Sequence, residues 1–453
     1  MDNRTRWVVA ALGVGTLLSP LNSSMIAVAL VPLRNDFGLG AAEVTWVVTA
    51  FYLASAAGQP LMGRIGDRSG PRRLFVTGMA AAAVVCGATA YAPTFGLVCA
   101  GRAALALATA TAFPSAVSMI RSVSETSGVS SSHLLGRLQI ANTAGAAIGP
   151  AVGGVLETLY GWQAIIVVSS PLALLSALGV AAWAPKDGAH AGGGLIETLR
   201  VSDVPGVTLF GAALVAGLVF ILELPTDPQW WLLPVAVVLT GAFVWRETRT
   251  TTPFFDLRSI AANRSLIVVY SSFTIFNLVF YLAFFGIPQT LQERGKYSSG
   301  ITGLLMLPLA AVTVVFTAVV AHEIDRRGLT RILRTGAIAL VGGCTLLLVG
   351  AGSLHPAAVL LMTAGLGIPY CIVNLALMQA LYASAVPGEA GVASGTFQAA
   401  RYLGAILATS ALGVVLASGD TAVNWSITAT IAIAMGAVHA GIVWRWRPPT
   451  ATS

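Results

Sequence analysis

The sequence predicts an all-α integral membrane protein that crosses the bilayer fourteen times. Of its 453 residues, 56% are hydrophobic and 9% are charged, whereas about 25% of residues in soluble domains carry charge. The apolar residues form blocks of about 20 residues, the length that an α-helix needs to cross about 30 Å of hydrocarbon. The chain also contains 48 glycines. In membranes, glycine lets neighbouring helices pack closely.

Fourteen apolar blocks are interpreted as spans. They begin near residues 7, 45, 74, 96, 134, 161, 204, 229, 265, 298, 334, 356, 392 and 422. The first block has no small-residue cleavage site, so we expect a retained span and not a removed signal peptide. An even number of spans places both termini on the same side of the membrane.

The basic residues predict the orientation. Most of the 25 lysines and arginines fall in alternate loops that include both termini, and only Arg34, Arg294 and Lys296 fall in the others. Because cytoplasmic loops carry the excess of Lys and Arg, we expect both termini in the cytoplasm of a protein of the inner or plasma membrane. This bias accounts for the net charge of +7, so no nucleic-acid partner is expected.

The residue types of enzymes and of metal sites do not cluster. The five histidines are scattered, and no carboxylate pair has the spacing of an acid/base or metal site. The four cysteines lie in apolar blocks without a CxxC pair, which argues against a disulfide framework. No nucleotide-binding glycine loop, filter-like loop or large soluble domain supports a channel or a sensor. We therefore expect a monomeric transporter of small molecules in the lipid bilayer, without cofactor or enzyme activity.

Two internal matches at nearly the same offset indicate a repeated half. After the second and tenth spans, the first match pairs Asp67, Arg68 and Gly70 with Asp325, Arg326 and Gly328. The second match pairs Gly136, Gln139 and Gly145 with Gly395, Gln398 and Gly404. Paired repeats with a site at their interface are typical of alternating-access transporters. We expect a six-helix bundle at 1–184, a linker at 185–203, an inserted hairpin at 204–246, a linker at 247–264 and a second six-helix bundle at 265–447.

Residues 63–73 carry the most specific motif. They read Gly-Arg-Ile-Gly-Asp-Arg-Ser-Gly-Pro-Arg-Arg. A glycine at 63 lets helices approach, and Gly70 permits a tight turn. The motif resembles the loop after the second span in the major facilitator superfamily, and the whole chain resembles its fourteen-helix drug:proton antiporter branch. The resemblance implies the major facilitator fold and a cytoplasmic latch between bundles made by Gly63, Arg64, Asp67, Arg68, Gly70 and Arg72, with Asp325 and Arg326 in the second half. The alternative is that these charges only fix the topology.

Residues 145–154 are similar to the antiporter motif of that family. Gly145, Gly149 and Gly153 recur every four residues and make a smooth helix face, while Pro150 removes a backbone donor. The resemblance implies export by proton antiport. A generic glycine zipper is the alternative. Two family features are altered, because Leu105 and Ala106 replace a glutamine and a glycine that usually follow Arg102, and Asn22 replaces an aspartate.

Polar residues inside spans are candidates for a central cavity. Arg102 and Arg401 either line or gate this cavity or bond helix carbonyls. The other candidates, each of which could instead join helices, are Asn22, Gln59, Gln139, Asn142, Asn277, Tyr281, Tyr370, Asn374 and Gln398. Phe276, Phe280, Phe284 and Phe285 form a stripe that either stacks on a ligand or forms lipid-facing core.

No acidic residue falls clearly at mid-span. Arginine effectively never loses its proton, so the cavity should repel cations and suit neutral or anionic ligands. Proton coupling would then need Glu157, Glu223, His439 or the substrate itself. We expect an exporter of small hydrophobic or amphipathic compounds, of the drug or antibiotic efflux type, with proton antiport and alternating access. The alternative is an exporter of neutral or anionic metabolites without classical proton coupling.

Overall fold

The computed structural model describes residues 3–127, 129, 131–187, 203–223, 228–250, 257–349, 353–384, 390–416 and 421–446. Every regular element in these ranges is helical. Ten segments of this described part are long and apolar enough to cross a membrane. The prediction of an all-α, multi-pass membrane protein is therefore confirmed.

The amino-terminal bundle is built around α1. Its long helices are α1 (Asn3–Met25), α4 (Trp46–Ser69), α5 (Pro71–Thr89), α6 (Phe95–Ala110) with α7 (Ala112–Ser127), α8 (Ser131–Tyr160), and α9 (Trp162–Val167) with α10 (Ser169–Trp183). The helix α1 packs against α8 and α10, and a 3-10 turn with the short helices α2 (Leu30–Phe37) and α3 (Ala41–Val44) links it to α4.

The carboxy-terminal bundle repeats this plan around α15. Its helices are α14 (Leu257–Ala262), α15 (Arg264–Glu293), α16 (Ser299–Leu305) with α17 (Leu307–Arg327), α18 (Leu329–Val349), α19 (Pro356–Ser384), α20 (Ala390–Leu416) and α21 (Thr421–Arg445). The helix α15 packs against α20 and α21, as α1 does against α8 and α10.

A helical hairpin separates the two bundles in the sequence. It consists of α12 (Val204–Glu223) and α13 (Leu232–Glu247), which pack on each other, and α12 also contacts α4 and α20. An ion pair between Arg246 and Asp203 joins the ends of the hairpin at 2.6 Å. The helices α5, α8, α12 and α13 are the predicted spans outside the ten long apolar segments. Much of the first predicted linker, 188–202, lies outside the described residues, as does 251–256 of the second.

The internal repeat has a structural counterpart in backbone geometry. Gly70 after α4 and Gly328 after α17 have φ angles of 98° and 83°, which residues with side chains rarely adopt. Each glycine N–H donates to the carbonyl four residues earlier, at 3.1 and 2.9 Å. Gly145 of α8 abuts Leu17 of α1, and its repeat partner Gly404 of α20 abuts Asn277 of α15. The matched glycines therefore have the same structural roles in the two halves, either in a turn or at a close helix contact.

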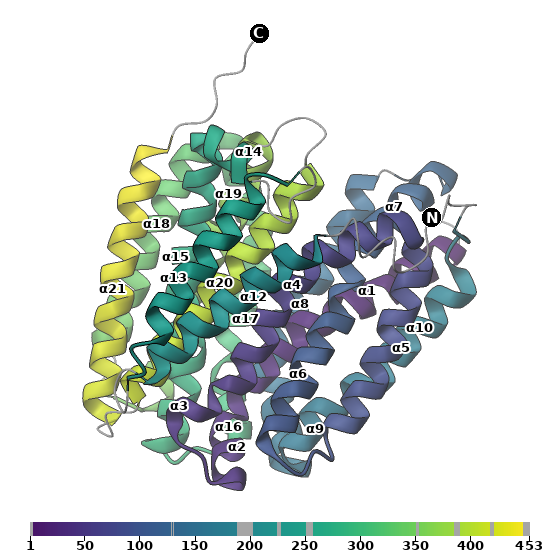
Figure 1. Ribbon diagram of the computed structural model, residues 1–453. Helices are drawn as coiled ribbons and strands as arrows, with labels where there is room; N and C mark the ends of the chain where they lie inside the picture. Colours follow the sequence, from purple (N-terminus) through teal and green to yellow (C-terminus); the bar gives the residue numbers. More distant parts are fainter. Residues whose placement is uncertain are drawn as a thin grey trace.

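Three helix–helix contacts hold the bundles together. The helix α8 packs against α16 and α17, and α4 packs against α20. Figure 1 shows the bundles side by side, with the start of α1 and the end of α21 toward the end opposite α2, α9 and α16. The space framed by these crossings lies between the two halves, where paired-repeat transporters place their substrate.

Candidate functional site

A cavity in two adjoining parts lies between the bundles. The parts span about 390 and 450 Å³ of space between protein atoms, some of which is open to solvent. Both parts share Pro20 and Ser23 of α1, Tyr281 of α15 and Arg401 of α20. Because each bundle supplies part of the wall, movement of one bundle against the other would change the cavity.

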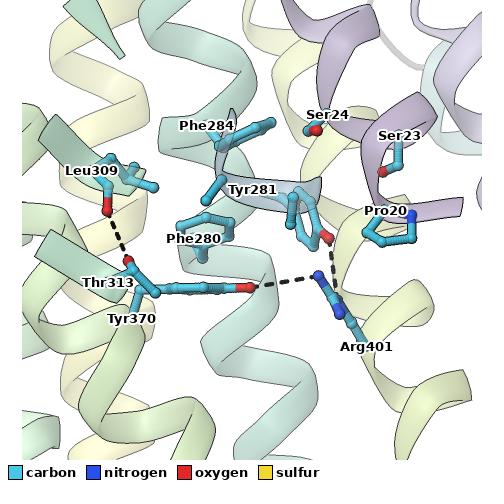
Figure 2. Close-up of a pocket in the computed structure, with 12 residues that line it drawn as sticks. Pro20, Ser23, Ser24, Phe280, Tyr281, Phe284, Leu309, Thr313, Tyr370 and Arg401 are labelled. Atoms are coloured by element: carbon cyan, nitrogen blue, oxygen red, sulfur yellow. Dashed lines mark hydrogen bonds between the residues drawn. The ribbon is translucent and has the colours of Figure 1, made fainter. Parts of the chain in front are cut away.

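The first part has an aromatic wall. Phe280, Phe284 and Tyr370 form one side, with Phe280 and Tyr370 stacked at a centroid distance of 4.1 Å. The facing side consists of small residues of α1 and α8, among them Ser24 and Ala147. Of the predicted phenylalanine stripe, Phe280 and Phe284 thus line the cavity, as Figure 2 shows for both.

The second part has a more polar wall. It is lined by Thr16, Ser19, Gln59, Thr109, Asn142, Gln398 and Tyr402, together with the shared residues. Gln59 of α4 donates to the hydroxyl of Tyr402 of α20 at 2.8 Å, so one polar wall residue also joins the two bundles. Asn142 and Arg401, which are equivalent positions at the offset of the second internal match, both line this part.

Arg401 is the charged group of the described cavity lining. Its Nε donates to the Tyr281 hydroxyl at 3.3 Å and its Nη2 donates to the Tyr370 hydroxyl at 3.5 Å (Figure 2). The residues that line the two parts include neither aspartate nor glutamate. The ion pairs within the described part of the chain also leave Arg401 out. A guanidinium with neutral partners therefore faces the space between the bundles.

Arg102 lies in a different environment. It is 1% exposed, within the amino-terminal bundle, and does not line the cavity. Its Nη1 donates to Oδ1 of Asn22 at 3.2 Å, its Nε donates to the Val47 carbonyl at 3.4 Å, and its guanidinium lies 4.5 Å from the centre of the Phe51 ring. Asn22 in turn donates to Ser169. For Arg102, the geometry favours the structural alternative over the cavity one.

The other sequence candidates divide into two groups. Gln59, Asn142, Tyr281, Tyr370 and Gln398 line the cavity with Arg401. Asn277 is buried and donates to a carbonyl of its own helix at 2.8 Å, and Asn374 is not among the lining residues. The side chain of Gln139 lies outside the described residues. Of the groups considered for proton coupling, Glu157, Glu223 and His439 are likewise not part of the described lining.

The motif at 63–73 joins α4 to α5. Gly63 lies against Pro114 of α7, which fits its expected role in close approach. The backbone amides of Arg72 and Arg73 each donate to one carboxylate oxygen of Asp187, both at 3.0 Å. Asp187 therefore neutralises the positive end of α5, and a Cβ at Gly70 would lie 2.5 Å from it. The side chains of Arg64, Asp67 and Arg68 lie outside the described residues.

The corresponding turn of the second half is held differently. Asp325 and Arg326 are exposed at the end of α17. Glu323 pairs with Arg327 at 2.5 Å and with Arg326 at 3.8 Å, all on the same helix. A Cβ at Gly328 would meet open space, whereas Gly70 is covered by Asp187. Asp187 was not among the residues predicted from the sequence, because no local pattern shows that a carboxylate beyond α10 reaches the start of α5.

The glycine motif of α8 serves two contacts. Gly145, Gly149 and Gly153 face α1, where a Cβ at Gly149 would overlap Ser24 and one at Gly153 would lie 2.8 Å from the Met25 carbonyl. On another side of the helix, Gly154 abuts Ser299, and the Pro150 carbonyl abuts Gly303. Residues 145–154 therefore form both the core of one bundle and its crossing with the other.

A group of bonds joins the bundles at the end away from the termini. Arg34 forms an ion pair with Glu293. Gln292 donates to the Val28 carbonyl, and the Gly300 amide donates to the hydroxyl of Thr158, both at 2.9 Å. Arg34 was predicted to lie in a loop, and nothing in the sequence pairs it with Glu293, which lies at the end of α15. We call this group the distal latch.

Comparison with known proteins identifies the family and the fold. A family model described as Major Facilitator Superfamily matches residues 12–409. Among solved structures, a D-xylose-proton symporter superposes with a TM-score of 0.69 at 13% identity, covering 99% of both chains. A bacterial homologue of the human lysosomal transporter Spinster gives a TM-score of 0.68 at 14% identity, covering 99% of this chain and all of that one. At these identities, the likeness supports the fold alone.

Several curated sequences are similar over most of their length. The uncharacterized MFS-type transporter YwoD of Bacillus subtilis is 34% identical over 94% of each chain. The multidrug efflux pump LfrA of Mycolicibacterium smegmatis is 28% identical over 90% of this chain and 80% of its own. The tetracenomycin C resistance and export protein of Streptomyces glaucescens is 27% identical over 90% of this chain and 75% of its own. The chain belongs to the major facilitator superfamily, and it is a multi-pass membrane transporter of small molecules and not an enzyme.

Proposed function

We propose that this protein is a secondary active exporter of small hydrophobic or amphipathic compounds, of the drug or antibiotic efflux type. The observation that carries the proposal is the cavity between the bundles, which joins an aromatic wall to a polar one. Such a lining suits ligands with both apolar and polar parts. Relatives named for multidrug efflux and for export of tetracenomycin C support the direction of transport.

The architecture of the fourteen-helix antiporter branch belongs to this proposal. Two six-helix bundles, at 1–184 and 265–447, would supply twelve spans, and the hairpin of α12 and α13 would supply two more. The apolar character of α12 and its contacts with α4 and α20 support a position in the bilayer beside both bundles. We propose a monomer of the inner or plasma membrane.

Both termini are proposed to be cytoplasmic, since most lysines and arginines lie in the loops of that side. The distal latch would then face outward. The ion pair and hydrogen bonds of this latch would keep the outer side closed, which corresponds to the state that loads substrate from the cell. Export requires these bonds to open while contacts at the opposite end form.

Proton antiport is the proposed source of energy, supported by the glycine motif in α8. One observation favours the second candidate, an exporter of neutral or anionic metabolites without classical proton coupling. The described cavity lining contains Arg401 and no carboxylate, and Asn22 lies beside Arg102 where the family branch has an aspartate. A proton carried by the substrate itself would reconcile coupling with this lining.

Transport in inverted membrane vesicles tests the proposal. A panel of labelled amphipathic compounds is offered to vesicles with the protein and to matched vesicles without it. We expect ATP-independent accumulation that requires the protein and collapses when the pH gradient is abolished. Accumulation that persists without the gradient would favour the uncoupled candidate. Failure to accumulate any compound, with correctly inserted protein, would contradict the exporter.

A further inference from the structure

We propose that Arg401, with the hydroxyls of Tyr281 and Tyr370, forms an anion subsite, and that the substrates are aromatic monoanions such as aryl carboxylates. The inference rests on the proposed function, since it assumes that the cavity binds the transported compound. It adds the chemical class of that compound and the atoms that recognise it. It also predicts that cationic compounds, which would suit a cavity lined by carboxylates, bind poorly.

The charges that line the cavity favour binding of an anion. Arg401 stays protonated, and a charged side chain within a membrane segment usually pairs with an opposite charge or with backbone carbonyls. Elsewhere in the described chain, Arg34 and Arg246 are neutralised by Glu293 and Asp203. Arg401 instead contacts uncharged phenols. A bound anion would supply the missing counter-charge within the wall as it stands.

Arg102 differs from Arg401 because a ligand in the cavity cannot reach it. Its guanidinium also lacks an ion-pair partner among the described residues, yet it is 1% exposed and surrounded by Asn22, the Val47 carbonyl and the Phe51 ring. No part of the cavity reaches it. Arg401, by contrast, lines both parts of the cavity, so a ligand can approach it.

Arg401 also has hydrogen-bond donors left for an anion. A guanidinium has about five N–H donors, and two of those of Arg401 are used at 3.3 and 3.5 Å. These bonds are longer than the usual distance of about 2.9 Å, so they compete weakly with a carboxylate. A carboxylate accepts two parallel N–H bonds from arginine. Tyr281 and Tyr370 keep their own O–H protons for a second contact with the anion.

The aromatic wall of the cavity favours an anion that contains an aromatic ring. Phe280 stacks on Tyr370 at 4.1 Å, and Phe284 lies 5.4 Å from Phe280. Figure 2 shows the Tyr370 hydroxyl directed at Arg401, with Phe284 further from the guanidinium. Small residues of α1 and α8 form the opposite side. A flat ring that entered the cavity would stack on this wall while its carboxylate contacts Arg401. A second acidic group would have no second cation in the described lining, which restricts the class to monoanions.

Binding of three probes with the same ring tests the charge preference. The probes are naphthoate, its neutral amide and the naphthyltrimethylammonium cation, and their dissociation constants are measured by calorimetry on the purified full-length protein. We expect naphthoate to bind most tightly and the cation most weakly. Tighter binding of the cation, or no binding of naphthoate, would overturn the proposal.

Variants then assign the preference to Arg401. Arg401→Gln should weaken naphthoate binding by about 10- to 100-fold, the range for hydrogen bonds to a charged group, and change amide binding by less than about 3-fold. Arg401→Lys should restore part of the loss. Arg331→Gln, a change at an exposed arginine outside the cavity, is the matched control. Tyr370→Phe, which removes one hydroxyl, should weaken only naphthoate binding and provides a test if Arg401→Gln is unstable.

The outcomes separate this inference from the proposed function. Unchanged naphthoate binding by well-folded Arg401→Gln, or by Tyr370→Phe where the first variant is unstable, overturns the anion subsite. If the vesicle panel is exported while cations bind better than naphthoate, the exporter stands and the subsite fails. If naphthoate binds through Arg401 and no compound is exported, the subsite stands and the exporter fails.

Discussion

At the scale of single residues, two arginines within membrane helices have opposite surroundings. Arg102 is enclosed by its own bundle, where Asn22 and the Val47 carbonyl accept its hydrogen bonds. Arg401 faces the cavity between the bundles. Both are arginines in apolar segments, so hydropathy alone cannot distinguish them. The difference arises from the rotation of each helix about its axis, which only tertiary packing fixes.

The Asn22–Arg102 contact predicts a stabilising substitution. In Asn22→Asp, a carboxylate would replace the amide that now accepts from Arg102, and Ser169 could donate to it. Hydrogen bonds between charged groups contribute about 1 kcal/mol more than neutral ones, so the melting temperature in detergent should rise by a few degrees. Asn277→Asp is the control, because Asn277 donates to the Phe273 carbonyl and an aspartate there would be repelled. An equal loss of stability in both variants would contradict the assignment.

At the scale of helices, the glycines of α8 set how closely it approaches α1 and α16. Gly149 meets Ser24 of α1, and Gly154 meets Ser299 of α16. A side chain at Gly149 would push α8 away from α1 within its own bundle, and one at Gly154 would separate the two bundles at their crossing. The motif thus links packing within one bundle to the crossing between bundles.

Enlarging Gly149 should slow transport more than it weakens binding. The Cβ of Gly149→Ala would overlap Ser24, so we expect a several-fold loss of turnover with little change in substrate affinity. Adding Ser24→Gly removes the overlapping atoms and should restore part of the rate. Ile148→Leu, at a neighbouring position that is 42% exposed, should behave as the parent. Weakened binding with unchanged turnover would show that Gly149 supports the site and not the motion.

Glycine patterns and long-range pairs differ in how well sequence predicts them. The turn at Gly70 and its repeat at Gly328 were predicted because a left-handed backbone restricts the residue locally. The packing face of Gly145, Gly149 and Gly153 followed from helical spacing. Asp187 and the Arg34–Glu293 pair were missed, because their partners are distant in sequence. Among the cavity candidates, Gln59, Tyr281 and Gln398 line the space whereas Asn277 does not, a distinction that depends on helix rotation.

At the scale of the whole molecule, the bonds between the bundles that the described residues form lie mainly along one side. The distal latch joins their ends, Thr49 contacts Thr409 at 3.1 Å, and Gln59 contacts Tyr402 nearer the cavity. In the proposed alternating-access cycle, these bonds would hold one of the two states. The opposite state would break them, so their strength would set the balance between the states.

Removing the ion pair of the latch should favour the outward-open state. Partly exposed ion pairs contribute up to about 1 kcal/mol, so Arg34→Gln should raise the population of that state up to about 5-fold. The change is read as faster labelling of Ala147→Cys, a cavity position, by an impermeant thiol reagent added outside. The charge reversal Arg34→Glu with Glu293→Arg should return labelling to the parental rate. Slower labelling in Arg34→Gln would show that the latch does not stabilise the state that is closed to the outside.

The central claim is that the two bundles rock about the cavity, and a reversible crosslink tests it most directly. The Thr49 and Thr409 hydroxyls lie 3.1 Å apart across the bundle interface, so a disulfide in Thr49→Cys with Thr409→Cys would lock this side closed. In proteoliposomes loaded with a compound that the parent exports, the oxidised double variant should show no transport, and reduction should restore it. Each single variant should transport under both conditions. Transport at the parental rate by the fully crosslinked protein would contradict the account.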